Sequence, residues 1–250
     1  MNEQPLVSIV TPIFNTKIEY LDKCLDSLLK QTYKNIEIIC VDDYSSNYNY
    51  DYITKLSPKI NLIRNESNLG CSKNAKKAFS LAKGKYIVKI DSDDYIHPTL
   101  IEKEVRVLEN NPNIGAICCE LRRFGYRHSI IRRPKKWSLE EALFVNMNKY
   151  GYAGGMMFRS DLLKDISIDT NYRVCEDFDF HLQILEKSSI ASIHEVLYFY
   201  RSHESNIMKA AYKNNERRDT VQKILTKHRN LYKEKHSKIK NTIKQKRIYF

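Results

Sequence analysis

The sequence predicts an α/β fold in which helices flank a Rossmann-like, mostly parallel sheet. Over the first 120 residues, short apolar segments with the composition of strands alternate with segments of helical period. Two acidic clusters, VDD at 41–43 and DSDD at 91–94, directly follow two of these strands, at the edge where open α/β sheets bind ligands. The length of 250 residues suits one domain of ordinary core size, or at most two small ones.

The first half of the chain reads as a regular alternation of the two element types. We expect strands at 6–14, 36–41, 60–63, 86–90 and 114–119, and helices at 18–31, 71–83 and 97–109. The first helix has an apolar face with helical spacing, which comprises Ile18, Leu21, Leu25, Leu28 and Leu29. Gly84 ends the second helix, and Pro98 suits the first turn of the third.

The second half is less regular. Residues 121–137 are basic and show no clear period, so we expect a loop there. Ser138 and Glu141 form a capping box at the start of a further helix. The remaining expected elements are a glycine-containing loop with a short apolar segment at 151–159, a helix with an acidic first turn at 175–187 and an extended segment at 190–201.

Positive charge is concentrated at the C-terminal end of the chain. The formal net charge is +12, and residues 209–250 contain 14 Lys and Arg against 3 Asp and Glu. The preceding 208 residues contain 28 basic and 27 acidic residues, so they are almost neutral. The body and the basic tail therefore need separate explanations.

The composition favours a reduced, cytoplasmic protein. Six cysteines are scattered through apolar segments without a CxxC pair, which indicates neither a zinc ribbon nor a disulfide framework. No apolar run approaches the roughly 20 residues of a spanning helix. The N-terminal residues MNEQPLVSIVTP lack the basic region and cleavage site of a secretory signal.

The DSDD cluster requires a positive partner, because three aspartates within four residues repel one another. Oxygen ligands of this kind suit Mg²⁺ or Mn²⁺. Asp91, Asp93 and Glu102 also match positions of a calcium-binding loop, but Ile96 stands where glycine is needed and Pro98 lies inside the loop, so that reading is excluded. The VDD cluster alone leaves two roles open, ligand contact and capping of the next helix.

Five segments occur in a fixed order, namely VSIVTPIFN, YLDKCLDSLLKQTYKNIEIICVDDYSS, NLGCSKN, AKGKYIVKIDSDDYIHP and CEDFDF. Together they resemble the family 2 glycosyltransferases, which are inverting, nucleotide-sugar-dependent enzymes with the GT-A fold. The resemblance runs from about residue 6 to 206. It implies a GT-A domain at 1–208, with a nucleotide-binding half at about 1–120 and an acceptor half at about 121–208. Residues 209–250 then form a basic, helical C-terminal extension.

The resemblance implies donor-binding roles for several positions. Thr11, Pro12 and Phe14 would line the pocket of the nucleotide base, and Asp43 would hydrogen-bond the base or the ribose. Lys73 and Arg201 would lie near the donor diphosphate. Lys73 stands where arginine is more usual in the family, and lysine keeps the charge but loses the bidentate geometry. The other implied substrate-binding residues are Asp91, Ser92, Gly154, Gly155 and Glu176.

The resemblance also implies a metal ion and a general base. Asp91 and Asp93 form the DxD pair and would hold Mn²⁺ or Mg²⁺ together with His203. Asp177 would take the proton from an acceptor hydroxyl as that oxygen displaces the diphosphate, which inverts the stereochemistry. Acidic residues at a helix start also stabilise the helix dipole, so a structural role for Glu176 and Asp177 stays open. Asp179 is the weaker candidate for the base.

The sequence thus predicts a transferase that moves a sugar from a nucleoside-diphosphate sugar, UDP-sugar being favoured, to a hydroxyl of a glycan or lipid-linked acceptor. Such a reaction belongs to polysaccharide or glycoconjugate synthesis. A sugar-phosphate nucleotidylyltransferase would have a glycine-rich loop after the first strand, and TPIFNTK has no glycine. A non-catalytic nucleotide-sugar-binding or scaffold protein remains the other alternative, although DSDD and ED are both intact.

The basic tail allows three readings. Apolar residues interspersed among its lysines and arginines are typical of a helix that lies on an anionic membrane face, which would place the protein at the inner face of a membrane. A solvated helix or a link to a protein partner is the simpler reading of the same pattern and is slightly favoured. Nucleic-acid binding is disfavoured, because the body is nearly neutral and carries no nucleic-acid-binding motif.

Overall fold

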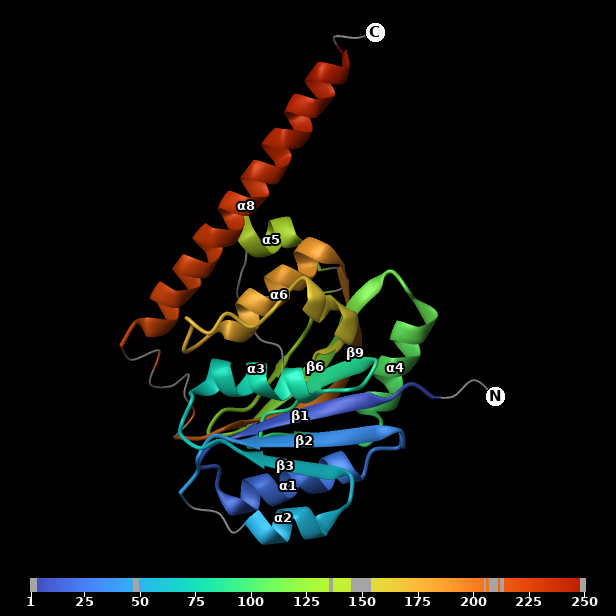
Figure 1. Ribbon diagram of the computed structural model, residues 1–250, viewed down its shortest axis with the longest axis vertical. Coiled ribbons are helices and arrows are strands. Elements are labelled where there is room, and N and C mark those ends of the chain that lie inside the picture. The colour runs from blue at the N-terminus through green and yellow to red at the C-terminus, as the bar shows by residue number, and fades with distance from the viewer. Residues whose placement is uncertain are drawn as a thin grey trace.

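The computed structural model describes residues 4–46, 50–134, 137–144, 154–204, 206, 211 and 214–247 (Figure 1). The strands are β1 (Val7–Ile13), β2 (Ile36–Asp42), β3 (Ile60–Arg64), β4 (Tyr86–Lys89), β5 (Tyr95–Ile96), β6 (Ile114–Gly125), β7 (Ser129–Ile131), β8 (Met157–Arg159) and β9 (Ser189–Ser202). The helices are α1 (Ile18–Leu29), α2 (Tyr50–Leu56), α3 (Cys71–Leu81), α4 (Leu100–Asn110), α5 (Leu139–Phe144), η2 (Ser160–Lys164), α6 (Glu176–Lys187) and α8 (Glu216–Arg247).

One sheet contains these strands in the order β3-β2-β1-β4-β8-β6-β9-β5, with β7 paired to β6. The chain moves outward from β1 to β2 and β3 and then returns to β4 on the other side of β1, and these pairs are all parallel. The order therefore reverses between β1 and β4. In open α/β sheets a ligand site lies at the carboxyl ends of the strands at such a switch point.

The rest of the sheet is mixed. β8 is antiparallel to both β4 and β6, whereas β6 and β9 are parallel along most of their length. We expected a loop at 121–137. This prediction is wrong for the first part of the segment, because β6 continues to Gly125 and pairs with β7. Residues 115–121 of β6 are buried on both faces and residues 122–125 are partly or fully exposed, so the sequence shows no alternation.

Helices cover both faces of the sheet (Figure 1). α1 and α4 pack on one face, and α3, α5 and α6 pack on the other. α1 buries Leu21, Cys24, Leu25 and Leu28, which is the spacing of a single helical stripe. This confirms the centre of the apolar face expected from the sequence, whereas Ile18 at the helix start is half-exposed and Leu29 is partly buried. The fold is therefore the predicted α/β architecture, and its parallel part carries the two acidic clusters.

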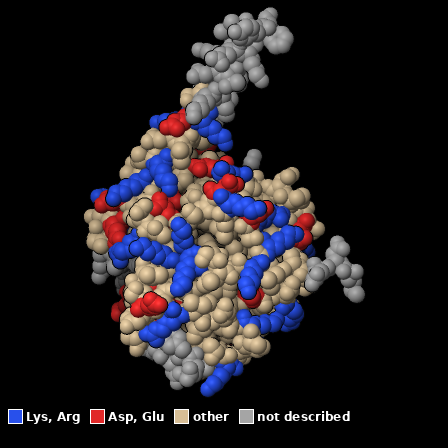
Figure 2. All heavy atoms as spheres, in the orientation of Figure 1, with Lys and Arg blue, Asp and Glu red and all other residues tan. Residues whose placement is uncertain are grey.

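The basic tail forms the long helix α8, which continues well beyond the body of the molecule (Figure 1). Its first half packs against the body, because Val221, Ile224 and Leu225 are buried in the same core as α6. In the view of Figure 2, basic and acidic side chains are interspersed over the body. Among the helices of the described part of the chain, none combines the length and apolar character required to cross a membrane.

Candidate active site

A cavity of about 640 Å³ lies at the carboxyl ends of β1 and β4. The starts of α3 and α6 and the end of β9 complete its walls. Most of the site residues predicted from the sequence line it, namely Pro12, Phe14, Asp43, Asp91, Ser92, Asp93, Gly154, Glu176, Asp177 and His203. Residues far apart in the sequence thus meet at the switch point of the sheet.

Four predicted residues do not line the cavity. Thr11 is fully buried and lies on the strand face of Ile9 and Ile13, because side chains alternate along β1. Lys73 is exposed on α3. The other two contact residues next to the cavity. Gly155 lies against the ring of Tyr198, and Arg201 donates a hydrogen bond to the backbone carbonyl of Asp93.

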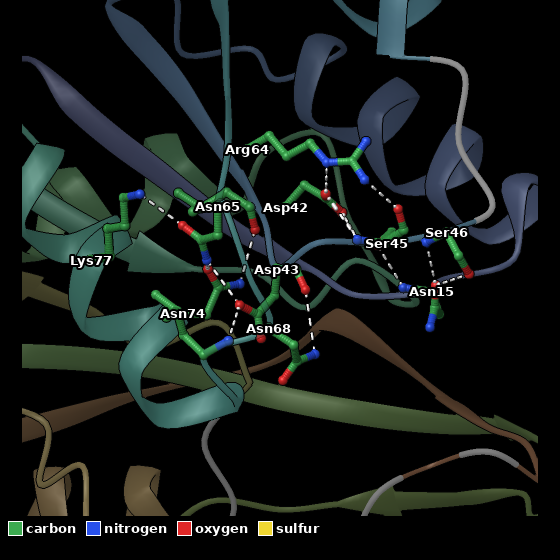
Figure 3. A network of polar contacts seen from close by, with 12 residues as sticks. Asn15, Asp42, Asp43, Ser45, Ser46, Arg64, Asn65, Asn68, Asn74 and Lys77 are labelled. Carbon is green, nitrogen blue, oxygen red and sulfur yellow. Dashed lines mark hydrogen bonds and ion pairs between the residues drawn. The ribbon is translucent and has the colours of Figure 1, made fainter.

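Asp43 forms the centre of a polar network at one end of the cavity (Figure 3). Its carboxylate accepts hydrogen bonds from Nδ2 of Asn65 at 2.8 Å and from the backbone N–H groups of Leu69 at 2.7 Å and Gly70 at 2.8 Å. Asn65 also donates to Oδ1 of Asn74 at 2.9 Å. Asp43 thus lines the cavity with its carboxylate fixed in position by these hydrogen bonds.

Asp42 organises the adjoining loop. It accepts a hydrogen bond from the backbone N–H of Ser45 at 3.0 Å and lies 3.7 Å from Nε of Arg64 (Figure 3). Asp43 meanwhile bonds Gly70, the residue that precedes α3. The VDD cluster thus ties β2 to the loop that follows it and to the start of α3. Phe14, half of whose surface is exposed (51%), lies at the same end of the cavity.

Each aspartate of the DSDD cluster has its own partner. Oδ1 of Asp91 lies 2.8 Å from Nζ of Lys89, and Oδ2 of Asp93 lies 2.7 Å from Nε2 of His203. Asp94 accepts hydrogen bonds from the hydroxyl of Tyr198 at 2.6 Å and from the backbone N–H of Arg201 at 2.7 Å. The mutual repulsion expected from the sequence is relieved by separate contacts of this kind.

Asp94 is structural. It is fully buried, and burial together with the charges of Asp93 and Asp91 raises its pKa well above the ordinary value. Arg201 supports the same loop, because its Nε donates to the carbonyl oxygen of Asp93 at 2.8 Å and its guanidinium lies 4.0 Å from the ring centre of Tyr20. Strand β9 therefore holds the DSDD loop in place.

Ser92 is also fixed, since its hydroxyl lies 2.6 Å from the hydroxyl of Thr16. Tyr198 links the loop to the two predicted glycines. A Cβ at Gly154 or Gly155 would lie 2.7 or 2.6 Å from atoms of the Tyr198 ring, so only glycine allows this approach. The resemblance implies that these two glycines bind substrate, and in the structure the close neighbour of both is the ring of Tyr198.

The opposite end of the cavity contains Glu176 and Asp177 at the start of α6, which confirms the helix with an acidic first turn. Sγ of Cys71, at the start of α3, lies 3.4 Å from Oε1 of Glu176. Burial and the neighbouring charge of Glu176 raise the pKa of Asp177 to about 7, while Lys89 opposes that rise. A carboxyl group with such a pKa suits proton transfer near neutral pH.

Asp179, the weaker candidate for the base, is occupied elsewhere. It is fully buried and contacts His228 and Lys227 of α8 at 2.9 and 3.0 Å. Burial would raise its pKa, but the hydrogen bonds from these two residues lower it below the ordinary value. Asp179 therefore anchors α8 to α6.

Sequence reasoning missed Lys89. It is the last residue of β4, and its side chain lines the cavity with 23% of its surface exposed. Burial lowers its pKa, but the attraction of Asp91, Cys71 and Glu176 outweighs burial and raises it above the ordinary value. The sequence did contain a signal for this residue, because Lys89 is a charged residue at the end of an otherwise buried strand, two positions before Asp91.

Asp93 and His203 are the residues best placed to hold a cation. The amide of Asn206 lies 3.1 Å from Nε2 of His203 and 3.4 Å from Oδ2 of Asp93. Carboxylate oxygens suit Mn²⁺ and Mg²⁺, and Mg²⁺ is often held by one or two carboxylates plus substrate phosphates. Within the described residues no group of three or more His, Cys, Asp or Glu side chains could hold a metal ion. Asp93 and His203 thus provide two candidate ligands for a cation.

Comparison with known proteins identifies relatives of the chain. The profile of the family described as Glycosyl transferase family 2 matches residues 8–167. An uncharacterized glycosyltransferase of Haemophilus influenzae is 29% identical over 242 residues, which cover 90% of this chain and 73% of that protein. Glycosyltransferase GlyG of Streptococcus pneumoniae is 28% identical over 242 residues, which cover 87% of this chain and 77% of that protein.

Solved structures have the same fold. S. aureus TarS 1-349 in complex with UDP-GlcNAc superposes with a TM-score of 0.70 at 21% identity, covering 82% of this chain and 61% of that one. The mannosyltransferase PcManGT of Pyrobaculum calidifontis, in complex with GDP-Man and Mn²⁺, superposes with a TM-score of 0.61 at 17% identity, covering 82% and 59%. The chain thus spans less than two thirds of either solved protein. Its fold and the family match agree, and the chain belongs to glycosyltransferase family 2, with the GT-A fold.

Proposed function

We propose that the protein transfers a sugar from a nucleoside-diphosphate sugar, with UDP-sugar favoured, to a hydroxyl of a glycan or lipid-linked acceptor, with inversion at the anomeric carbon. The observation that carries the proposal is the presence in one cavity of the Asp93–His203 pair and of Asp177, whose pKa is raised to about 7. The first suits a cation with a diphosphate, and the second suits a general base.

Three parts of the cavity have separate tasks in this proposal. The end with Phe14 and Asp43 receives the nucleoside, with the aromatic ring against the base and the fixed carboxylate as hydrogen-bond acceptor. Asp93 and His203 hold Mn²⁺ or Mg²⁺, which when bound neutralises charge on the leaving diphosphate. Asp177 takes the proton from the acceptor hydroxyl.

Several predicted contacts remain part of the proposal in altered form. Asp91 faces the donor beside Lys89 and is less suited than Asp93 to the cation. Arg201 acts through the DSDD loop, which it supports. Lys73 is exposed, so its contact with the diphosphate requires a reorientation of its side chain toward the cavity.

The alternative classes are less well supported. A nucleotidylyltransferase-like enzyme lacks support because TPIFNTK contains no glycine and the chain belongs to a transferase family. A non-catalytic nucleotide-sugar-binding or scaffold protein has no need of a partly buried carboxyl group with a pKa of about 7 beside the cavity.

The test is a donor panel with purified protein and Mn²⁺. UDP-glucose, UDP-GlcNAc, UDP-galactose and GDP-mannose are offered with and without candidate acceptors, and released nucleoside diphosphate is measured. We expect turnover of at least one UDP-sugar and its loss in Asp93→Ala. If no donor binds or turns over, and Asp93→Ala changes nothing, the enzyme proposal is wrong.

For the basic tail we propose peripheral contact with an anionic membrane surface at the inner, cytoplasmic face. Residues 233–247 contain seven Lys and Arg and one Glu, and α8 continues as a helix through this part beyond the body (Figure 1). Each basic residue near an anionic surface contributes about 1 kcal/mol. Flotation with anionic and neutral liposomes compares the full chain with one ending at residue 232. Equal flotation of the two chains would contradict the membrane proposal and favour a protein partner or a solvated helix.

A further inference from the structure

We propose that Lys89, together with Asp91, binds a hydroxyl of the transferred sugar and thereby selects a neutral sugar donor. This inference rests on the proposed function. Lys89 ends β4 directly at the switch point, its side chain lines the cavity, and its Nζ lies 2.8 Å from Oδ1 of Asp91. The two groups thus present a hydrogen-bond donor and an acceptor side by side.

The side chain of Lys89 points toward the cavity layer. Val88 and Ile90 are buried in the core beneath α1 and α4, and strand alternation places Lys89 with Ile87 on the face of α3 and α6. An ammonium group has three N–H donors, and within the described residues Asp91 accepts one of them. Further donors are therefore available to oxygen atoms in the cavity.

The charges around Lys89 indicate which part of the donor it meets. The cation and the diphosphate are proposed to bind at Asp93, whose carboxylate contacts His203 and Asn206. Lys89 instead interacts with Asp91 and Glu176, at the start of α6 where Asp177 lies. The group that connects a leaving diphosphate to an attacking acceptor oxygen is the transferred sugar. A cation on the acceptor side of the diphosphate therefore meets that sugar.

The balance of charge favours a neutral sugar. A ring hydroxyl can donate to the carboxylate of Asp91 and accept from the ammonium of Lys89 at the same time. Glu176 and Asp177 lie on the same side of the cavity. Arg173 also lines the cavity there but is paired with Glu216, so among the described residues carboxyl groups outnumber basic groups on this side. A sugar carboxylate would meet this excess of negative charge. We therefore infer a hexose or N-acetylhexosamine donor and expect discrimination against a uronic acid.

Calorimetric titration in the presence of Mn²⁺ tests the inference. The ligands are UDP and the matched sugars UDP-glucose, UDP-GlcNAc, UDP-galactose and UDP-glucuronate. We expect the wild type to bind one of the neutral sugars more tightly than UDP-glucuronate. Lys89→Met should weaken binding of that UDP-sugar about tenfold or more while leaving UDP binding within about twofold, because a hydrogen bond from a charged group is lost only with the sugar present.

Two further variants separate sugar binding from folding. Lys89→Gln retains the chain length and a donor and should be intermediate. Lys85→Met is the matched control and should behave like the wild type. The Lys85 side chain is half-exposed, pairs with Glu109 and does not line the cavity. Equal weakening of UDP and UDP-sugar in both Lys89 variants, or unchanged binding of both ligands, would overturn the role of Lys89. Failure of the wild type to bind any UDP-sugar would instead overturn the proposed function itself.

Discussion

His228 of α8 and Asp179 of α6 form a fully buried pair, with Nε2 and Oδ1 2.9 Å apart. Nδ1 of the same imidazole lies 2.6 Å from Oε1 of Glu186, two turns farther along α6. α6 begins with Glu176 and Asp177. Through these contacts of His228, α8 holds in place the helix that carries the proposed base. The first half of the basic tail is consequently part of the support of the site.

Replacing His228 by alanine should destabilise the protein. Removing one partner of a buried ion pair leaves a buried charge with less compensation, so we expect His228→Ala to lower the free energy of unfolding by about 3 kcal/mol. Urea denaturation measures the change. His194→Ala is the matched control, because His194 is half-exposed and lies 3.5 Å from Glu120; we expect about 0.5 kcal/mol or less there. Equal effects of the two substitutions would contradict the role of His228.

The contribution of His228 should depend on pH. Burial opposes protonation, but the hydrogen bonds that the imidazole donates to Asp179 and Glu186 prevail and raise the pKa of His228 above its ordinary value. A raised folded-state pKa gives stability that is present below the unfolded value and lost as pH rises through the folded one. The difference in unfolding free energy between wild type and His228→Ala should therefore be larger near about pH 6 than near about pH 9. Lys227 also contacts Asp179, but it is present in both proteins, so its direct contribution cancels in this difference.

Gly155 should be more sensitive to substitution than Gly70. Both have a positive φ, +72° and +84°, but a Cβ at Gly155 would meet the Tyr198 ring at 2.6 Å, whereas no described residue would come within 4 Å of a Cβ at Gly70. Gly70→Ala should cost about 1–2 kcal/mol from backbone strain alone, and Gly155→Ala clearly more. Thermal unfolding compares them. Similar losses in both variants would show that the Tyr198 contact has little weight.

Activity should follow the ionisation of Asp177. Burial and Glu176 raise its pKa to about 7, and a general base acts in its deprotonated form. kcat/KM should therefore rise about tenfold per pH unit below neutrality and level off above it. Glu176→Gln removes the neighbouring negative charge and should move the acidic limb to lower pH. A limb that does not move in this variant would argue against Asp177 as the titrating group.

Cation binding should depend more on Asp93 than on Asp91. Asp93 lies beside His203, whereas the carboxylate of Asp91 is paired with Lys89. In a Mn²⁺ titration followed by electron paramagnetic resonance with UDP present, Asp93→Asn and His203→Gln should each weaken binding by about 10–100-fold, the range found for groups that orient or hold a metal. Asp91→Asn should weaken it less. The reverse order would make Asp91 the principal ligand.

Much of the fold was predictable because the parallel half has strong local signals. The helical stripe of α1, the strands ending at Asp42 and Lys89, and the acidic start of α6 all agree with the sequence pattern. The β6–β7 hairpin was not predictable, because its order comes from pairing with β9 rather than from alternation. The short strand β8 likewise depends on its two neighbours.

The candidate site was predictable in its members but less in its contacts. The resemblance brought together the aspartates, the ED pair and His203, and the cavity contains them all. It could not reveal Lys89, the Tyr198 contact with the glycines or the burial of His228, because each depends on which side chains meet across elements distant in the sequence. It also placed Arg201 at the diphosphate, whereas the guanidinium packs on Tyr20 behind the DSDD loop.

The most direct test of the account is the comparison of wild type and Asp177→Asn with the donor that the panel identifies. We predict that kcat falls by about 10²–10⁴-fold in this variant, the contribution of a general base. Donor binding, measured by calorimetry, should stay within about twofold of the wild type, because the group lost acts on the acceptor and not on the nucleotide. Turnover by Asp177→Asn at the wild-type rate would contradict the account.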